Sequence, residues 1–245
     1  MVLRTFKALA VVVGIAAATA VVAAQSFGYF GPTGPTHWSE LNPAWSACGN
    51  GRIQSPVDFR PPYPLQSGKL PIEYSDTTGE IINNGHTIEV ETEGAHNTLT
   101  LNGVEYELVQ FHFHSVSEHR VEARGFDMEL HLVHASHDGA NAVIGVFLKR
   151  APSSGSLAPI FHNLPDDVNA KHPLDTPFNP RNFLPKSDTR FRYVGSLTTP
   201  PCTEGVQWIV MTEPVTVSDE DMAQFNERIH FNARPVQRQV RAPLP

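Results

Sequence analysis

Strict alternation of imidazole and apolar side chains in two short segments constrains the fold of this chain more than any other feature. Residues 110–114 read QFHFH, so the two-residue period of a β-strand puts His112 and His114 on one face and the phenylalanines on the other. Residues 129–133 read ELHLV and place His131 opposite the leucines. The sixteen residues from 115 to 130 are enough for the second strand to return beside the first. The sequence therefore predicts three imidazoles that point the same way from neighbouring strands.

Three histidines with a fourth position left open form the ligand set of a catalytic zinc site, in contrast to a closed structural one. Gln110 and Glu129 each stand two positions before a histidine, where a side-chain oxygen can accept a hydrogen bond from the imidazole and fix its tautomer. An isolated histidine is usually a core or surface residue, but this spacing and pairing favour a metal site. We therefore expect Zn²⁺ at His112, His114 and His131.

One rival metal site also fits part of this region. His112, His114, Glu118 and Gly125 have the spacing of the first metal motif of the cupin family, in which the glutamate binds iron or manganese. No glycine lies six residues before His112, and the second cupin motif is absent from the sequence.

The rest of the chain favours strands. A hairpin is predicted where Thr98–Leu101 and Val104–His114 flank Asn102-Gly103, the residues of a type I′ turn. Further strands are expected at Ile88–Glu91, Glu129–Ala135, Ala142–Leu148 and Val206–Met211, and residues 151–190 as loop or very short helix. One helix is expected, capped at Ser218 and running through Met222, Phe225 and Ile229. These elements predict a single, mainly β domain with antiparallel pairing and long connections.

Charge excludes two classes of partner. The chain has 18 Lys and Arg against 25 Asp and Glu, a net charge of −7, which is the wrong sign for binding nucleic acid or an anionic membrane.

The first 24 residues read as a secretory signal peptide. Arg4 and Lys7 precede the apolar run Ala8–Ala24, which leaves residues 25–245 as the mature domain, in the periplasm or secreted, with no membrane contact after cleavage. An uncleaved anchor is the alternative. In an oxidising compartment Cys48 and Cys202 are expected to form a disulfide, and the alternative is two buried, unpaired thiols.

Ordered motifs over nearly the whole mature chain resemble the alpha-class carbonic anhydrases. The motifs are residues 54–58 (QSPVD), 83–86 (NNGH), 110–114, 117–119 (SEH), 129–134, 195–202 and Asn232 with Arg234-Pro235. The resemblance implies one large, mostly antiparallel twisted sheet with a few short peripheral helices. It also implies zinc-dependent, reversible hydration of carbon dioxide to bicarbonate and a proton, with zinc-bound hydroxide as the nucleophile.

The same resemblance assigns roles residue by residue. His112, His114 and His131 are similar to the zinc ligands, and Glu118 to the acid that holds the hydroxyl of Thr198. His86 is similar to the proton shuttle. The apolar wall for carbon dioxide matches Val133, Val143, Leu197, Val206 and Trp208, the bicarbonate site Thr199, and the water-ordering side Tyr29 and Asn84. The paired cysteines resemble the secreted bacterial branch.

Two positions depart from the family. Ser115 stands where animal members have an aromatic, and Glu89, three residues after His86, where the family usually has a neutral amide. A non-catalytic binding protein on the same scaffold stays an alternative, although such relatives typically lack one of the three histidines. The partners expected are small molecules, carbon dioxide and bicarbonate, and the sequence leaves a homodimer open.

Overall fold

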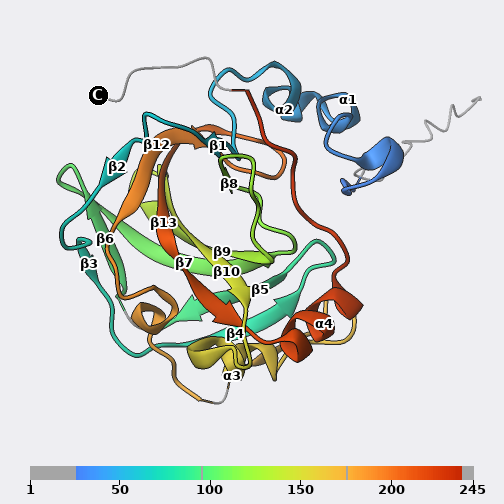
Figure 1. Ribbon diagram of the computed structural model, residues 1–245. Helices are drawn as coiled ribbons and strands as arrows, with labels where there is room; N and C mark the ends of the chain where they lie inside the picture. Colours follow the sequence, from blue (N-terminus) through green and yellow to red (C-terminus); the bar gives the residue numbers. More distant parts are fainter. Residues whose placement is uncertain (1–25, 95, 175, 239–245) are drawn as a thin grey trace, which may run out of the picture.

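The computed structural model describes residues 26–94, 96–174 and 176–238 (Figure 1). The predicted signal peptide lies outside these residues. Within them, no helix has the length and apolar character needed to cross a membrane.

One large twisted sheet organises the molecule (Figure 1). Its main path runs β11-β4-β5-β7-β9-β10-β13-β12-β2, with β3 and β6 attached through β7, and β1 and β8 form a separate pair. The strands are β1 (Asp58–Phe59), β2 (Leu65–Gln66), β3 (Ile72–Glu73), β4 (Thr78–Asn83), β5 (Ile88–Glu93), β6 (Thr98–Leu101), β7 (Val104–His114), β8 (Arg120–Val121), β9 (Met128–Ser136), β10 (Asn141–Arg150), β11 (Lys171–Pro173), β12 (Arg190–Ser196) and β13 (Glu204–Val217).

The two strands predicted to carry the histidines are neighbours. β7 and β9 pair antiparallel, with His112 opposite His131. The predicted hairpin is also confirmed, since β6 and β7 pair around Asn102 and Gly103, whose φ angles of 51° and 78° suit a type I′ turn.

The fold class is confirmed: the domain is mainly β and its pairs are mostly antiparallel. The exceptions are β10 with β13 and β1 with β8, which run parallel. The sequence analysis missed β4 and β12, although residues 190–194 (RFRYV) do alternate in the way a half-buried strand requires.

Helices are short and peripheral. The predicted helix forms as α4 (Asp219–Arg228), where the Ser218 hydroxyl accepts a hydrogen bond from the Asp221 amide at 3.0 Å. The one-turn helices α1 (Trp38–Leu41) and α2 (Ala47–Asn50) and the 3₁₀ turns η1 (Gly31–Thr33) and η2 (Pro43–Trp45) were not predicted. Residues 151–190, expected as loop or very short helix, do hold α3 (Ala158–Phe161), η3 (Gly155–Leu157) and η4 (Pro180–Phe183), but also the short strand β11. Beyond α4 the chain runs back along the flank of the domain toward α1 and α2 (Figure 1).

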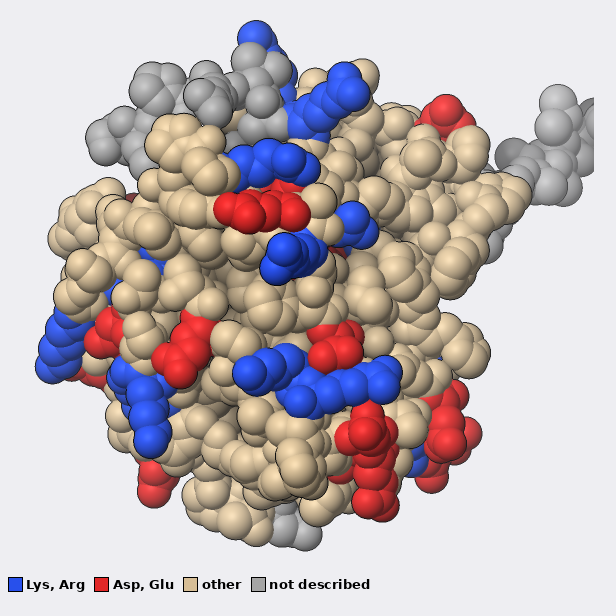
Figure 2. All heavy atoms as spheres, viewed as in Figure 1, with Lys and Arg blue, Asp and Glu red and all other residues tan. Residues whose placement is uncertain are grey.

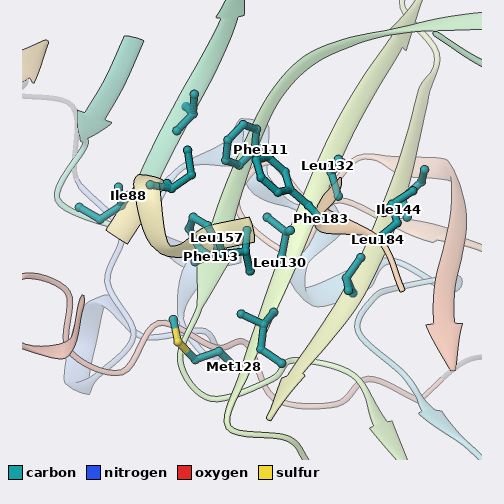
Figure 3. Close-up of a cluster of buried hydrophobic side chains, with 14 of the residues drawn as sticks. Ile88, Phe111, Phe113, Met128, Leu130, Leu132, Ile144, Leu157, Phe183 and Leu184 are labelled. Atoms are coloured by element: carbon teal, nitrogen blue, oxygen red, sulfur yellow. The ribbon is translucent and has the colours of Figure 1, made fainter. Parts of the chain in front are cut away.

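The main core lies on the face of β7 and β9 that points away from the histidines. Phe111, Phe113, Leu130 and Leu132 are fully buried there and pack with residues from β10, η3 and η4 (Figure 3). Because side chains alternate along a strand, burying these residues turns the imidazoles toward the opposite face.

Surface charge is mixed on the face that Figure 2 shows, where basic side chains lie beside acidic ones. Arg150, for example, contacts both Asp127 and Asp219.

Candidate active site

Three imidazoles from β7 and β9 converge on one point. One ligand atom from each of His112, His114 and His131 lies within 4.8 Å of the other two. The other ring nitrogen of His112, Nδ1, lies 2.8 Å from Gln110 Oε1, and Nε2 of His131 lies 2.9 Å from Glu129 Oε1. Each ring is therefore held by an acceptor at one nitrogen and offers the other to the shared point.

His114 is held by the backbone instead of a side chain. Its Nδ1 donates to the carbonyl oxygen of Asn232 at 2.8 Å, and the Asn232 side chain accepts from the Ser115 amide at 2.8 Å. Nε2 of His114 is buried and has no hydrogen-bond partner among the described residues. A buried nitrogen without a partner is costly unless something binds it.

The donor set fits zinc. Three imidazoles with one position open are the ligands of catalytic zinc, and they bind in the neutral form. Burial, followed by the neighbouring imidazoles, lowers the pKa of His112 well below its usual value, and burial lowers the pKa of His114. His112 and His114 therefore present neutral rings at physiological pH.

Glu129 is the centre of a buried hydrogen-bond network behind the triad. Its Oε2 accepts from the amides of Glu118 and His119 at 2.9 and 2.8 Å, and its Oε1 lies 2.7 Å from His119 Nδ1. Nε2 of His119 in turn contacts the Tyr193 hydroxyl. Burial raises the pKa of Glu129, but the paired His119 and His131 outweigh it and hold that pKa well below the usual value. The carboxylate is thus a fixed acceptor for His131.

Glu118 lies between the triad and the C-terminal segment. Its Oε1 accepts from the Arg234 amide at 2.8 Å, while Oε2 lies 3.5 Å from His114 Nε2 and has no hydrogen-bond partner among the described residues. The predicted bond from the Thr198 hydroxyl is therefore not formed with Oε2 in this structure. Both side chains are buried, and the roles of Glu118 and Thr198 stay predictions.

The five residues predicted to form an apolar wall lie in one cluster. Val143, Val206 and Trp208 belong to its buried part, and Val133 and Leu197 pack against it. Val143 pairs with Val133 on one side and with Trp208 on the other, which makes a continuous surface across β9, β10 and β13. The Trp208 ring lies 4.9 Å from the ring of His131. The wall is therefore adjacent to the triad.

Polar residues of the predicted site lie in two turns. Asn84 uses its Oδ1 to accept from the amides of His86 and Thr87, both at 2.9 Å, so this oxygen shapes the turn before β5. Its role in ordering water stays a prediction. Thr199 accepts through its carbonyl from the Cys202 amide at 2.8 Å, in the turn after β12. Tyr29, in the N-terminal segment, is half-buried, and desolvation raises the pKa of its hydroxyl.

The predicted disulfide is confirmed: Cys48 and Cys202 are bonded across 154 residues. Cys202 ends the turn that carries Thr198 and Thr199, so the bond fixes this turn to α2. The guanidinium of Arg234 donates a hydrogen bond to the Cys48 carbonyl at 3.0 Å, which connects the C-terminal segment to α2 as well.

Asn232 is the site residue whose role sequence reasoning missed. The motif comparison noted it without a function, and the structure assigns it the hydrogen bond to His114. No side-chain pattern predicts this contact, because the acceptor is a backbone carbonyl 118 residues away.

A large, mostly antiparallel sheet with three convergent imidazoles beside an apolar wall is the architecture of the alpha-class carbonic anhydrases. The family model of the eukaryotic-type carbonic anhydrases matches residues 33–245, and the chain belongs to this family. The cupin alternative is therefore wrong.

Individual proteins that the chain resembles support the same family. A carbonic anhydrase from Pectobacterium carotovorum is 39% identical over 212 residues, which cover 86% of each chain. A hyperthermostable carbonic anhydrase identified from an active hydrothermal vent chimney is 40% identical, with a TM-score of 0.84, over 88% of this chain and 97% of that one. A dioscorin, in a structure described as complexed with ascorbate, is 32% identical with a TM-score of 0.80, over 87% and 94%.

Proposed function

We propose that this protein is a zinc enzyme that interconverts carbon dioxide and bicarbonate. The observation that carries the proposal is the triad: three imidazoles, each held at one nitrogen, offer their remaining nitrogens to one point beside an apolar wall. When bound, zinc supplies the Lewis acidity that makes hydroxide available at neutral pH, as is established for carbonic anhydrases.

The protein's own residues bind the substrate, orient the attacking oxygen and remove the proton. Carbon dioxide carries no charge, so the Val143 and Trp208 surface is suited to hold it by apolar contact. The Thr198 hydroxyl orients the attacking oxygen, and Thr199 receives bicarbonate. His86 carries away the proton released in each cycle, since an imidazole titrates near neutral pH.

A stopped-flow assay of carbon dioxide hydration, combined with metal analysis, tests this function. We expect about one zinc per chain, loss of activity after chelation and recovery with added zinc. His114→Ala, which removes one ligand, should abolish both metal binding and activity. Activity that survives complete removal of zinc would refute the proposal.

A non-catalytic binding protein is the second candidate, because a dioscorin shares this fold. The complete triad favours catalysis. Stoichiometric zinc without measurable hydration would favour the binding function instead.

We also propose that the protein is exported and works in the periplasm or outside the cell. The disulfide supports this, since such bonds persist in oxidising compartments. The mass of the protein recovered from the periplasmic fraction should correspond to a chain that begins at Gln25. A full-length chain in the membrane fraction would indicate an anchor.

A further inference from the structure

Glu89, one of the two positions at which the sequence departs from its family, lies beside the triad. It belongs to β5, where Ile88 and Val90 are fully buried in the core. Because side chains alternate along a strand, Glu89 points to the opposite face. In the antiparallel register of β5 and β7 it is directly opposite His112, and opposite residues of such a pair share a face. The half-buried Glu89 side chain therefore lies on the face that carries the histidines.

The side-chain contact of Glu89 is with Gln110, the residue that holds His112. Its Oε2 accepts from Gln110 Nε2 at 3.2 Å, and Gln110 Oε1 accepts from His112 Nδ1 at 2.8 Å. Burial, followed by the neighbouring Glu91, raises the pKa of Glu89. The bond that it accepts from Gln110 acts in the other direction and favours the ionised form. Two consecutive hydrogen bonds thus connect the Glu89 carboxylate to the imidazole of His112.

A carboxylate gives these two bonds only one possible direction. It accepts hydrogen bonds and cannot donate them, so Gln110 must turn Nε2 toward Glu89 and has only Oε1 left for His112. An oxygen at that place requires the proton on Nδ1 of the ring. The lone pair of the neutral imidazole is then on Nε2, the nitrogen that remains for a metal. A neutral amide at position 89 could present either end to Gln110 and would impose no direction.

We propose that Glu89 is a positioning residue for the metal: through Gln110 it fixes the tautomer of His112 and so presents Nε2 to zinc. This inference rests on the proposed function, because it assumes zinc at the triad. His131 offers a comparison, since the carboxylate of Glu129 contacts its ring directly at 2.9 Å. For His112 the carboxylate acts across one intervening amide.

The first test measures zinc affinity by equilibrium competition with a chelator. Glu89→Leu removes the acceptor and keeps apolar bulk, and it should weaken zinc binding about fivefold, the worth of one hydrogen bond. Loss of a residue that bonds a ligand directly costs more, about 10-fold to 100-fold. Glu89→Gln can still accept from Gln110 but can also donate to it, so its affinity should lie between those of the parent and Glu89→Leu.

Glu91→Gln is the matched control. Glu91 belongs to the same face of β5 and is opposite Gln110 in the register, yet no side-chain hydrogen bond joins the two among the described residues. The substitution removes the same charge and leaves the bond from Gln110 to Glu89 in place. Its zinc affinity should equal that of the parent.

The second test needs neither metal nor activity. In zinc-free protein labelled with nitrogen-15 histidine, NMR should show the proton of His112 on Nδ1 in the parent and both tautomers in Glu89→Leu. The His112 signals are those absent from His112→Ala. His114, whose Nδ1 donates to the Asn232 carbonyl, and His131 should keep their tautomers. A general loss of packing would disturb all three rings.

The outcomes separate this proposal from the proposed function. Unchanged zinc affinity in Glu89→Leu overturns the role of Glu89, and so does a mixture of His112 tautomers in the parent. An equal loss of affinity in Glu91→Gln would assign the effect to charge and also overturn it. A parent that binds no zinc contradicts the proposed function instead, and the tautomers of the zinc-free protein still decide whether Glu89 orients His112.

Discussion

Removing the disulfide between Cys48 and Cys202 should destabilise the protein strongly, because the bond closes a loop of 154 residues. In the chain-entropy model the denatured chain loses about 17 cal/mol/K on closing a loop of this length, or about 5 kcal/mol at 25 °C. The predicted mature domain, residues 25–245, should unfold with an entropy of about 0.46 kcal/mol/K at its midpoint. Dividing the free energy by this entropy gives a fall in melting temperature of about 11 °C.

The assay is calorimetric unfolding of the parent and of the double variant Cys48→Ala with Cys202→Ala. Alanine suits both positions because both side chains are buried in an aromatic cluster. The oxidised parent should show no reactive thiol when denatured. The double variant in the presence of reductant is the control, since reductant should lower the melting temperature of the parent only. A shift below about 3 °C would refute the reasoning from loop length.

Three further outcomes are expected. His112→Ala or His131→Ala should lose most of the zinc and nearly all hydration activity, because two imidazoles cannot hold the ion; retained zinc would contradict the ligand set. Thr198→Ala should keep the zinc and lower kcat about 100-fold, measured by stopped flow, since the attacking oxygen loses its orienting hydroxyl. Burial lowers the pKa of His134 to about 4, so between pH 6.5 and 4 the unfolded chain binds a proton that the folded one does not. The free energy of unfolding should therefore fall by about 3 kcal/mol as the pH is lowered from 6.5 to 4. Urea titrations should show a smaller fall in His134→Gln.

The strands that carry the histidines could be predicted from the sequence, because alternation of apolar and polar residues indicates both a strand and which of its faces is buried. β7 and β9 each place leucine or phenylalanine between polar residues, and packing then decides which way the imidazoles point. The pairing of Cys48 with Cys202 followed from the expected compartment and the family resemblance. Both predictions use information carried by the side chains themselves.

Other features depend on how distant parts of the chain come together, and no pattern of side chains in the sequence indicates them. The Asn232 carbonyl reaches His114 only because the segment after α4 returns along the domain. The parallel pairing of β10 with β13 requires a long irregular crossover, for which residues 151–190 offer no periodicity. Asn84 looked like a residue that faces water, yet its oxygen satisfies two amides of its own turn.

The C-terminal segment packs against the site, so the complete site can form only after this segment has been synthesised. His131 and both β7 histidines are translated about 100 residues before Asn232, which holds His114, and Arg234, whose amide holds Glu118. β13, which completes the apolar wall, also comes late in the chain. A nascent chain that has not yet reached β13 therefore carries every proposed zinc ligand without the frame that orients them. Metal loading is consequently expected to follow synthesis of the segment through Arg234.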